Sequence, residues 1–156
     1  MNQVLIIPAG AEHIDGIIAL LPRLADFEVP SHRQATDLWH GDADLLRAWA
    51  CDQRLDVSVC VAVDETGNVL GVAAASERED LLSHAPSAHL EVLSVAGHVE
   101  RQGLGHRLLA SIEQTMRDKG ATGMSLHVFG NNHRARALYA REGFDEEIVR
   151  CFKPFD

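Results

Sequence analysis

The chain has 156 residues, of which 46% are hydrophobic and 24% are charged, a balance typical of one soluble globular domain. Its net charge of −9 excludes general nucleic-acid binding, which depends on lysine and arginine side chains that neutralise phosphates. No apolar run approaches the roughly 20 residues of a membrane-spanning helix. We therefore expect a single domain over residues 1–156, with neither nucleic acid nor membrane among its partners.

The cysteines and the N-terminus indicate the compartment. Cys51, Cys60 and Cys151 are an odd number without metal-ligand spacing, and the nine histidines show no His-x-x-x-His pattern. The apolar start at residues 4–7 is too short for a signal-peptide core, and no basic residue precedes it. The sequence predicts a reduced, cytoplasmic protein without a metal site.

The first third of the chain alternates regular and irregular segments. Residues 2–9 predict a strand, and apolar side chains at helical spacing predict a helix over residues 14–21. Residues 25–41 have no clear period and contain a proline, two histidines and a tryptophan. Long irregular segments are often functional, so we expect a substrate loop there. A short helix follows, with Asp42 or Asp44 as its N-cap.

The remainder alternates between strands and helices. Alternating valines predict a hairpin over residues 56–77, and an apolar stripe predicts a helix over residues 104–119. Residues 124–129 and 146–154 predict two further strands, with a helix between them that Asn132 caps.

One further strand is predicted over residues 88–96. Successive side chains of a strand point to opposite faces. One face would carry His89, Glu91, Leu93 and Val95, and the other would carry Leu90, Val92 and Ser94. The element order is then β-α-α-β-β-β-α-β-α-β. This order predicts a single-domain mixed α/β fold with a central sheet flanked by helices.

The stretch ERQGLGHRLL, residues 100–109, places Gly103 and Gly105 where a loop becomes an amphipathic helix. Glycine allows close approach of the backbone, and a helix N-terminus favours negative charge. Residues 98–141 carry seven basic against three acidic side chains, a net of +4 in an acidic chain. Because Gly-Lys-Ser/Thr and a third glycine are both missing, the stretch is neither a Walker loop nor a dinucleotide fingerprint. It predicts another kind of anion site.

Two signatures resemble those of the GCN5-related N-acetyltransferases, the GNAT family, which bind acetyl-coenzyme A. Residues 90–109 (LEVLSVAGHVERQGLGHRLL) are similar to the family's core strand, pyrophosphate loop and helix, without a gap. Residues 132–144 (NHRARALYAREGF) resemble its second signature, and residues 6–21 resemble its first strand and helix. The resemblance implies a GNAT-like fold and an acetyl-coenzyme A-dependent N-acetyltransferase.

The resemblance also implies which residues bind the coenzyme. The loop amides would take the pyrophosphate, the main chain of the core strand would bond the pantetheine arm, and Asn132 would contact the cofactor, cap its helix, or do both. The implied set is Leu93, Ser94, Val95, Arg101, Gln102, Gly103, Leu104, Gly105, His106, Arg107, Asn132, Ala135 and Tyr139. There is one departure: Glu100 stands where the family usually has Gln or Arg. Its carboxylate would weaken binding unless it faces solvent, with Arg101 and Arg107 supplying positive charge.

Acetyl transfer to an amine needs two proton movements. An amine like that of lysine has a pKa of about 10.4 and must lose a proton before it attacks. Tyr139 occupies the position of the family's tyrosine, which protonates the leaving thiolate, although a tyrosine there could also only pack. The base matches His89 in histone-type members and Glu91 in some polyamine acetyltransferases. Either could instead bind the positive charge of the acceptor, and proton removal through water is a further alternative.

The acceptor and the class of activity stay open at this point. Five acidic residues lie in or near the irregular segment: Asp26, Glu28, Asp37, Asp42 and Asp44. They suit a small cationic or peptide acceptor, or they only keep the loop soluble. Trp39 and Trp49 line a pocket or fill the core. Direct transfer in a ternary complex is expected, because no cysteine has a matching base. The alternatives are a non-catalytic acyl-coenzyme A binding or sensing domain and an interaction protein, and the family resemblance implies a homodimer.

Overall fold

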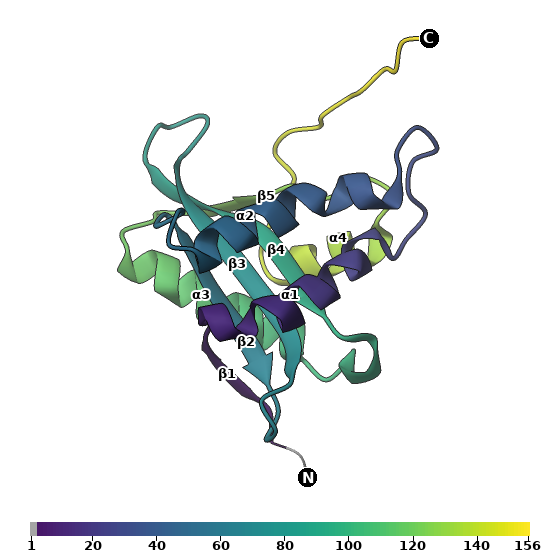
Figure 1. The fold of residues 1–156 in the computed structure, drawn as a ribbon. Coiled ribbons are helices and arrows are strands. Elements are labelled where there is room, and N and C mark those ends of the chain that lie inside the picture. Colours follow the sequence, from purple (N-terminus) through teal and green to yellow (C-terminus); the bar gives the residue numbers. More distant parts are fainter. Residues whose placement is uncertain (1–2) are drawn as a thin grey trace.

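The computed structural model describes residues 3–156, which form a five-stranded sheet between helices (Figure 1). The strands lie across the sheet in chain order: β1 (Leu5–Pro8), β2 (Val57–Val63), β3 (Val69–Glu79), β4 (Pro86–Val95) and β5 (Met124–Leu126). The first four are antiparallel to their neighbours, whereas β5 runs parallel to β4. The expected mixed α/β fold with a central sheet and flanking helices is confirmed.

Helices cover both faces of the sheet, as Figure 1 shows. α1 (Ile14–Leu20) and α2 (His40–Ala50) pack on one face, and α3 (Leu104–Asp118) and α4 (His133–Arg141) on the other. The central strand β3 contributes alanines to both cores, with Ala74 facing α1 and α2 and Ala73 and Ala75 facing α3. These small side chains are fully buried, so helices approach the middle of the sheet from both sides.

β4 contains a bulge that changes the predicted faces. Ala74 pairs with Val92 and Ala75 pairs with Leu90, so Glu91 is an extra residue in β4. Before the bulge Leu90 packs in the α3 core, but after it Val92 packs in the α1–α2 core. The prediction that His89, Glu91, Leu93 and Val95 share one face is therefore wrong. Leu93 and Val95 pack toward α3, while Glu91 shares the α2 face with His89, whose ladder partner is Ser76.

A strand end, a whole strand and a helix cap differ from the prediction. β5 ends at Leu126 instead of residue 129, because its ladder with β4 has only three pairs. The strand predicted over residues 146–154 does not form, and this segment extends away from the body (Figure 1). α2 begins at His40 with Trp39 at its N-cap, so Asp42 and Asp44 lie inside the helix and do not cap it. Among the helices of residues 3–156, none has both the length and the apolar character to cross a membrane.

Candidate active site

A cavity of about 880 Å³ opens where β4 and β5 separate. The strands pair only from Ala88 with Met124 to Leu90 with Leu126. Beyond these pairs, residues 89–95 line one wall of the cavity and residues 126–129 line the other. The bulge at Glu91 coincides with the start of the opening. Bulges bend a strand and increase its twist, which accounts for a cleft at this point in the sheet.

The main chain of β4 faces the cleft at alternate residues. Ala96 N–H donates to Leu70 O of β3 (2.8 Å), so even-numbered residues after the bulge point their polar groups toward β3. By the same alternation the backbone groups of Leu93 and Val95 point into the cleft. Arg23 Nε donates to Val95 O (2.8 Å), as this direction requires. The Ser94 side chain is used elsewhere, since its Oγ donates to Leu20 O (2.9 Å).

The glycine loop lies at the far end of the same cavity. Arg101 and Gly103 adopt left-handed backbone conformations, with φ of 64° and 77°. Gly103 is the N-cap of α3, and within the part of the chain that the structure describes no side chain caps this helix. The amides of the first turn are therefore available to a ligand. Arg101, Gly103, Leu104, Gly105 and His106 all line the cavity, so the uncapped first turn of α3 lies at this end of it.

Glu100 is held between two arginines. Arg23 Nη2 donates to Glu100 Oε1, and Arg134 Nη2 lies 2.7 Å from Glu100 Oε2. The hydrogen bond from Arg134, followed by the positive charges of Arg23, Arg134 and Arg101, lowers the pKa of the Glu100 carboxyl. Glu100 departs from the family pattern, but its negative charge is compensated because Arg23 and Arg134 both pair with it.

α4 supplies the wall of the cavity beside the loop. The Asn132 side chain accepts a hydrogen bond from Ala135 N–H (3.3 Å), so the predicted N-cap is confirmed, and both residues line the cavity. Tyr139 also lines it and packs edge-on against Phe144, with ring centroids 5.7 Å apart. Burial raises the pKa of Tyr139 to about 12, so this hydroxyl keeps its proton at neutral pH.

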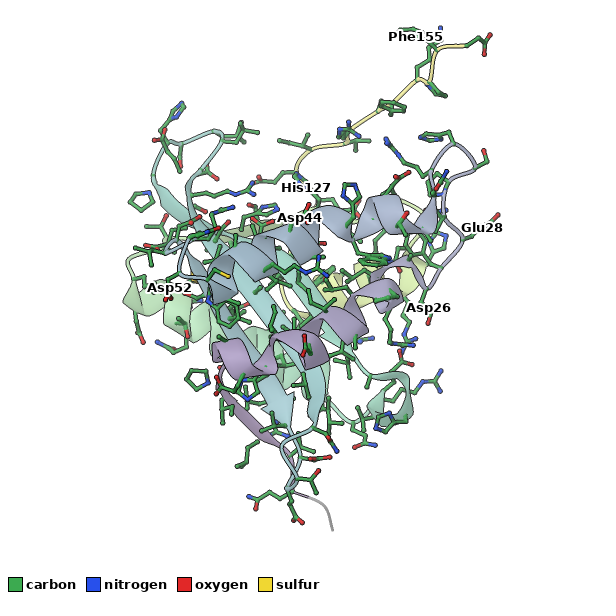
Figure 2. All side chains as sticks on the ribbon, in the orientation of Figure 1. Asp26, Glu28, Asp44, Asp52, His127 and Phe155 are labelled. Atoms are coloured by element: carbon green, nitrogen blue, oxygen red, sulfur yellow. The ribbon has the colours of Figure 1, made fainter. Side chains whose placement is uncertain are left out.

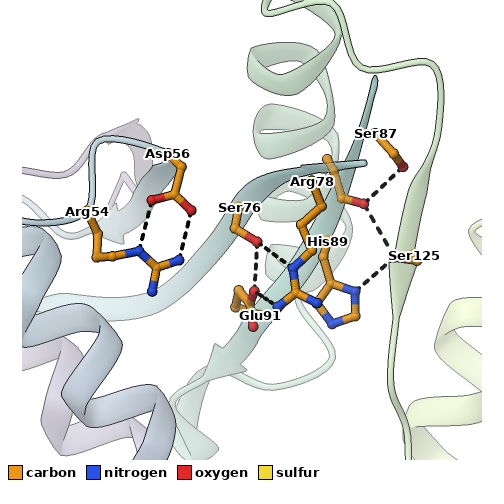
Figure 3. A network of polar contacts seen from close by, with 9 residues as sticks. Arg54, Asp56, Ser76, Arg78, Ser87, His89, Glu91 and Ser125 are labelled. Atoms are coloured by element: carbon orange, nitrogen blue, oxygen red, sulfur yellow. Dashed lines mark hydrogen bonds and ion pairs between the residues drawn. The ribbon is translucent and has the colours of Figure 1, made fainter. Parts of the chain in front are cut away.

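The opposite end of the cavity is built around Glu91 (Figure 3). Ser76 Oγ donates to Glu91 Oε1 (2.7 Å), and Arg78 Nη2 donates to the same oxygen (2.6 Å). The Glu91 side chain is only 12% exposed. Both contacts use Oε1, and together they fix the carboxylate on the wall of the cavity.

His89 lies beside this carboxylate on the same face (Figure 3). Its Nδ1 is 2.8 Å from Ser125 Oγ, and its ring packs 4.8 Å from that of His127. Burial, the charge of Arg78 and the neighbouring His127 lower the pKa of His89 to about 4, although Glu91 acts in the opposite direction. The imidazole is therefore neutral at pH 7 and has little tendency to take up a proton.

The segment after α1 and the start of α2 complete the cavity wall. Leu24, Asp26, Leu38 and Asp42 line it, with Asp26 beside Arg23 at the loop end (Nη1 to Oδ2, 3.1 Å) and Asp42 near Glu91 at the other. Burial, with a smaller contribution from the charge of Glu91, raises the pKa of Asp42 to about 7. The segment is joined to the opposite wall, because Phe27 packs 5.6 Å from Phe129 and Asn131 Nδ2 donates to Glu28 O.

Not every residue expected at the site lies on the cavity wall. Gln102 and Arg107 are outside the lining, and the Arg107 guanidinium instead donates to Val4 O (2.9 Å). Of the five acidic residues expected around the acceptor, only Asp26 and Asp42 line the cavity, whereas Glu28, Asp37 and Asp44 lie outside it; Asp26, Glu28 and Asp44 are labelled in Figure 2. Among the described residues, no group of three His, Cys, Asp or Glu side chains is placed to hold a metal ion.

The tryptophans and cysteines have structural positions. Trp39 and Trp49 pack against the α1–α2 core, the second of the two predicted alternatives. Cys60 is buried in the α3 core, and burial raises the pKa of its thiol to about 11, which makes it inert as an acetyl carrier. Cys51 and Cys151 are exposed free thiols.

Several polar residues of the site carry no sequence signature. They come from segments outside the two motifs or from positions that the motifs do not specify: Arg23, Ser76, Arg78, Ser125, His127 and Arg134. Ser76 and Arg78 occupy alternate positions of β3, a two-residue spacing that places both on one face. That spacing is the one signal from which this pair could have been found.

Comparison with known proteins agrees with this geometry. Residues 21–144 match the acetyltransferase (GNAT) family. The uncharacterized N-acetyltransferase YhfO of Bacillus subtilis (strain 168) is 30% identical over 118 residues, which cover 74% of this chain and 75% of that protein.

Solved structures share the fold at low sequence identity. A putative acetyl transferase from Pyrococcus furiosus has a TM-score of 0.78 at 21% identity, over 98% of this chain and 100% of that one. AAC(6')-Iy in complex with the bisubstrate analog CoA-S-monomethyl-acetylneamine has a TM-score of 0.74 at 22% identity, over 99% of both chains. The GNAT-like fold expected from the two signatures is confirmed.

Proposed function

The chain belongs to the acetyltransferase (GNAT) family, and from this membership we propose that it transfers an acetyl group from acetyl-coenzyme A to the amine of a small cationic acceptor. Transfer would be direct, in a ternary complex. One observation carries the proposal: a single cavity joins an end lined by backbone amides to an end lined by carboxylates, with Tyr139 on its wall.

The loop end fits the coenzyme. The uncapped N-terminus of α3 and the loop backbone from Arg101 to His106 offer amides to a pyrophosphate. The backbone groups of Leu93 and Val95 that face the cleft would bond the pantetheine arm, although Val95 O already accepts from Arg23. Asn132 and Ala135 would contact the same ligand from α4. Gln102 and Arg107 would contribute through the backbone only, because the Arg107 side chain is bound to Val4 O.

Tyr139 is proposed as the general acid. As the amine attacks the thioester carbonyl, the C–S bond breaks and the departing thiolate needs a proton. The raised pKa of Tyr139, about 12, keeps its hydroxyl protonated at the pH of the reaction. A buried phenol without charge can also lie against the thioester without an electrostatic penalty.

The carboxylate end is proposed to bind and deprotonate the acceptor. Glu91, fixed by Ser76 and Arg78, would hold the ammonium form of the amine. Asp42, whose pKa of about 7 matches the pH of the reaction, would take the proton directly or through water. With its pKa of about 4, His89 is a poor base, so we assign it a positioning role beside Glu91.

The negative charge of Asp42 and Glu91 indicates the class of acceptor. Arg78 pairs with Oε1 of Glu91, but Asp42 and Glu91 still present two carboxylates to one cavity, which favours a polyamine or an aminoglycoside-like amine over a neutral amino acid. The bisubstrate analog bound by AAC(6')-Iy joins coenzyme A to acetylneamine, and that protein shares this fold. We also propose that the enzyme works in the cytoplasm as a homodimer. Its three free cysteines suit a reducing compartment.

Two measurements test the proposal in sequence. Calorimetric titration with acetyl-coenzyme A should give micromolar binding, whereas ATP, as a control for phosphate alone, should give none. Release of free thiol is then measured with polyamines, aminoglycosides and neutral amino acids, and the cationic amines should be the substrates. Coenzyme binding without release by any amine would instead favour an acyl-coenzyme A sensor. No binding would overturn both assignments.

A further inference from the structure

The side chain of Arg23 crosses the loop end of the cavity from outside both signatures. Arg23 lies in a 3₁₀ turn, Leu21–Ala25, that follows α1. The backbone of this turn is anchored, because Leu21 is fully buried and Ser94 Oγ of β4 donates to Leu20 O (2.9 Å). The guanidinium, at the end of a stem with several rotatable bonds, can therefore move while the backbone stays in place.

The guanidinium of Arg23 bonds to three different segments. Nε donates to Val95 O (2.8 Å), Nη1 donates to Asp26 (3.1 Å) and Nη2 donates to Glu100. Arg134 holds the other oxygen of Glu100, with its Nη2 2.7 Å from Oε2. All five residues line the same cavity. Two arginines thus hold one carboxylate at the end of the cavity that is proposed for the pyrophosphate.

Two of these contacts use groups that the coenzyme would also use. The carbonyl of Val95 faces the cleft, where the pantetheine arm would bond to it. A phosphate accepts paired N–H bonds from a guanidinium much as a carboxylate does. Glu100 therefore takes the place of an anionic ligand, and Arg23 Nε takes the place of a ligand N–H on Val95 O.

The guanidinium also lies close against the backbone before the glycine loop. A Cβ built on Gly97 would come 3.0 Å from Arg23 Nη1 and 3.5 Å from Arg23 Cζ, so any side chain there would crowd the arginine. The missing side chain at residue 97 allows this close approach. The positive charge of Arg23 is thereby held next to the main-chain groups that would receive the coenzyme.

We propose, as a consequence of the proposed function, that Arg23 restricts the loop end to the intact coenzyme. In the free protein Arg23 occupies Val95 O and Glu100, and on binding it exchanges both for the pyrophosphate. The exchange frees Val95 O for the pantetheine arm. A ligand with this arm but without a pyrophosphate must displace Arg23 and offers it no anion in return, so it binds poorly.

The exchange leaves no charge unpaired. Glu100 keeps its contact with Arg134, so its carboxylate is not left alone beside the pyrophosphate. The side chains of Arg23 and Glu100 are 29% and 25% exposed, and ion pairs with this access to water contribute little to stability. Arg23 can therefore give up one anion for another at small cost.

The test compares two ligands, coenzyme A and pantetheine, in wild type and in Arg23→Met. Methionine keeps an unbranched stem but has no N–H to donate. Coenzyme A, titrated by calorimetry, should bind about five- to tenfold more weakly to the variant, because the pyrophosphate loses a charged partner. Pantetheine, titrated by NMR, should bind a few-fold more tightly, because Val95 O is then free.

Arg136→Met is the matched control. Arg136 also bonds one carbonyl oxygen, Gly130 O (2.7 Å), and one carboxylate, that of Glu146 (2.8 Å), but it lies outside the cavity. Its substitution removes the same charge from the chain and should leave both affinities unchanged. Arg23→Lys keeps the charge but cannot make all three bonds at once, so for both ligands it should fall between wild type and Arg23→Met.

Glu100→Gln gives an independent readout of the exchange. It releases Arg23 and Arg134 together, so the gain in affinity for coenzyme A should be smaller in the Arg23→Met background, where only Arg134 is released. An equal gain in both backgrounds would mean that Arg23 and Glu100 act independently, which would overturn the proposal.

Opposite changes for the two ligands distinguish this role of Arg23 from others. A structural role would weaken both ligands, and a general attraction for anions would weaken coenzyme A and leave pantetheine unchanged. Either result would overturn the proposal and leave the proposed function standing. A wild type that does not bind coenzyme A would instead overturn the proposed function, and the role of Arg23 with it.

Discussion

The two ends of the cleft are built from different parts of the polypeptide. The end of the cleft that we propose for the coenzyme, the coenzyme end, consists of main-chain groups of nearby residues, chiefly Leu93, Val95 and the loop that opens α3. The end that we propose for the acceptor, the acceptor end, consists of side chains from separate elements: Asp42 of α2, Ser76 and Arg78 of β3, and Glu91 of β4. A main-chain site depends on backbone conformation, whereas a side-chain site depends on each residue. Substitutions should therefore cost more at the acceptor end.

The charges of the two ends also differ. Arg23, Arg101 and Arg134 surround the loop, and together they neutralise Glu100. At the other end the carboxylates of Asp42 and Glu91 lie near enough that the second raises the pKa of the first. An anion and a cation would thus each find a complementary end of one cavity.

The largest effect is expected at Tyr139, where the two ends meet. Tyr139→Phe keeps the ring and its edge contact with Phe144 but removes the hydroxyl, so turnover should fall about 100-fold or more. Affinity for acetyl-coenzyme A should stay nearly unchanged. Steady-state kinetics and calorimetry on the same preparation separate the two quantities. Equal turnover in the variant would mean that Tyr139 only packs.

Glu91→Gln should give the next largest effect. It removes the charge that would hold the ammonium but can keep a hydrogen bond from Ser76. A hydrogen bond to a charged group contributes about 1.5–3 kcal/mol, so kcat/KM for a cationic acceptor should fall about 10- to 100-fold. Coenzyme affinity should not change.

Glu77→Gln is the matched control for Glu91→Gln. Glu77 is an exposed carboxylate on the neighbouring strand β3, outside the cavity, and pairs with Lys119 at 3.8 Å. Its substitution should leave kcat/KM unchanged. If both variants lose activity equally, net charge and not the cavity carboxylate would be responsible.

Asp42 makes the acceptor end sensitive to pH. With a pKa of about 7, Asp42 is neutral below that pH and charged above it. Because the charged form attracts a cation and accepts its proton, kcat/KM should rise several-fold through pH 7 in wild type. Asp42→Asn should remove that step from the profile of kcat/KM against pH. Asp44→Asn, on the same helix but outside the cavity, should keep it.

The sequence predicted the local structure around the glycine loop better than that around Glu91, for a physical reason. The loop, the N-cap at Asn132 and the tyrosine lie within contiguous motifs, where local spacing determines the geometry. Ser76 and Glu91 meet only through the pairing of β3 with β4. One bulge at Glu91 reversed the faces assigned to Leu93 and Val95, since a single extra residue changes every later position.

The fold shows the same limit at its C-terminus. Alternating apolar residues predicted strands over residues 124–129 and 146–154, yet a strand forms only where a neighbour supplies the ladder. β4 reaches β5 as far as Leu126, and the tail finds no neighbour within the described chain. The apolar pattern shows that these segments can form strands, but a strand forms only where a neighbouring strand pairs with it.

The smallest effect is expected at Glu100, which lies between Arg23 and Arg134 beside the glycine loop. Glu100→Gln releases Arg23 and Arg134 from a half-exposed ion pair that contributes little, about 0.2–1 kcal/mol. The freed arginines can then turn toward a pyrophosphate, so acetyl-coenzyme A should bind a few-fold more tightly, with a steeper dependence on salt. Calorimetry at two ionic strengths measures both changes. Weaker binding of the variant would mean that Glu100 orients the arginines for the coenzyme, and that side chains as well as main chain build this end of the cleft.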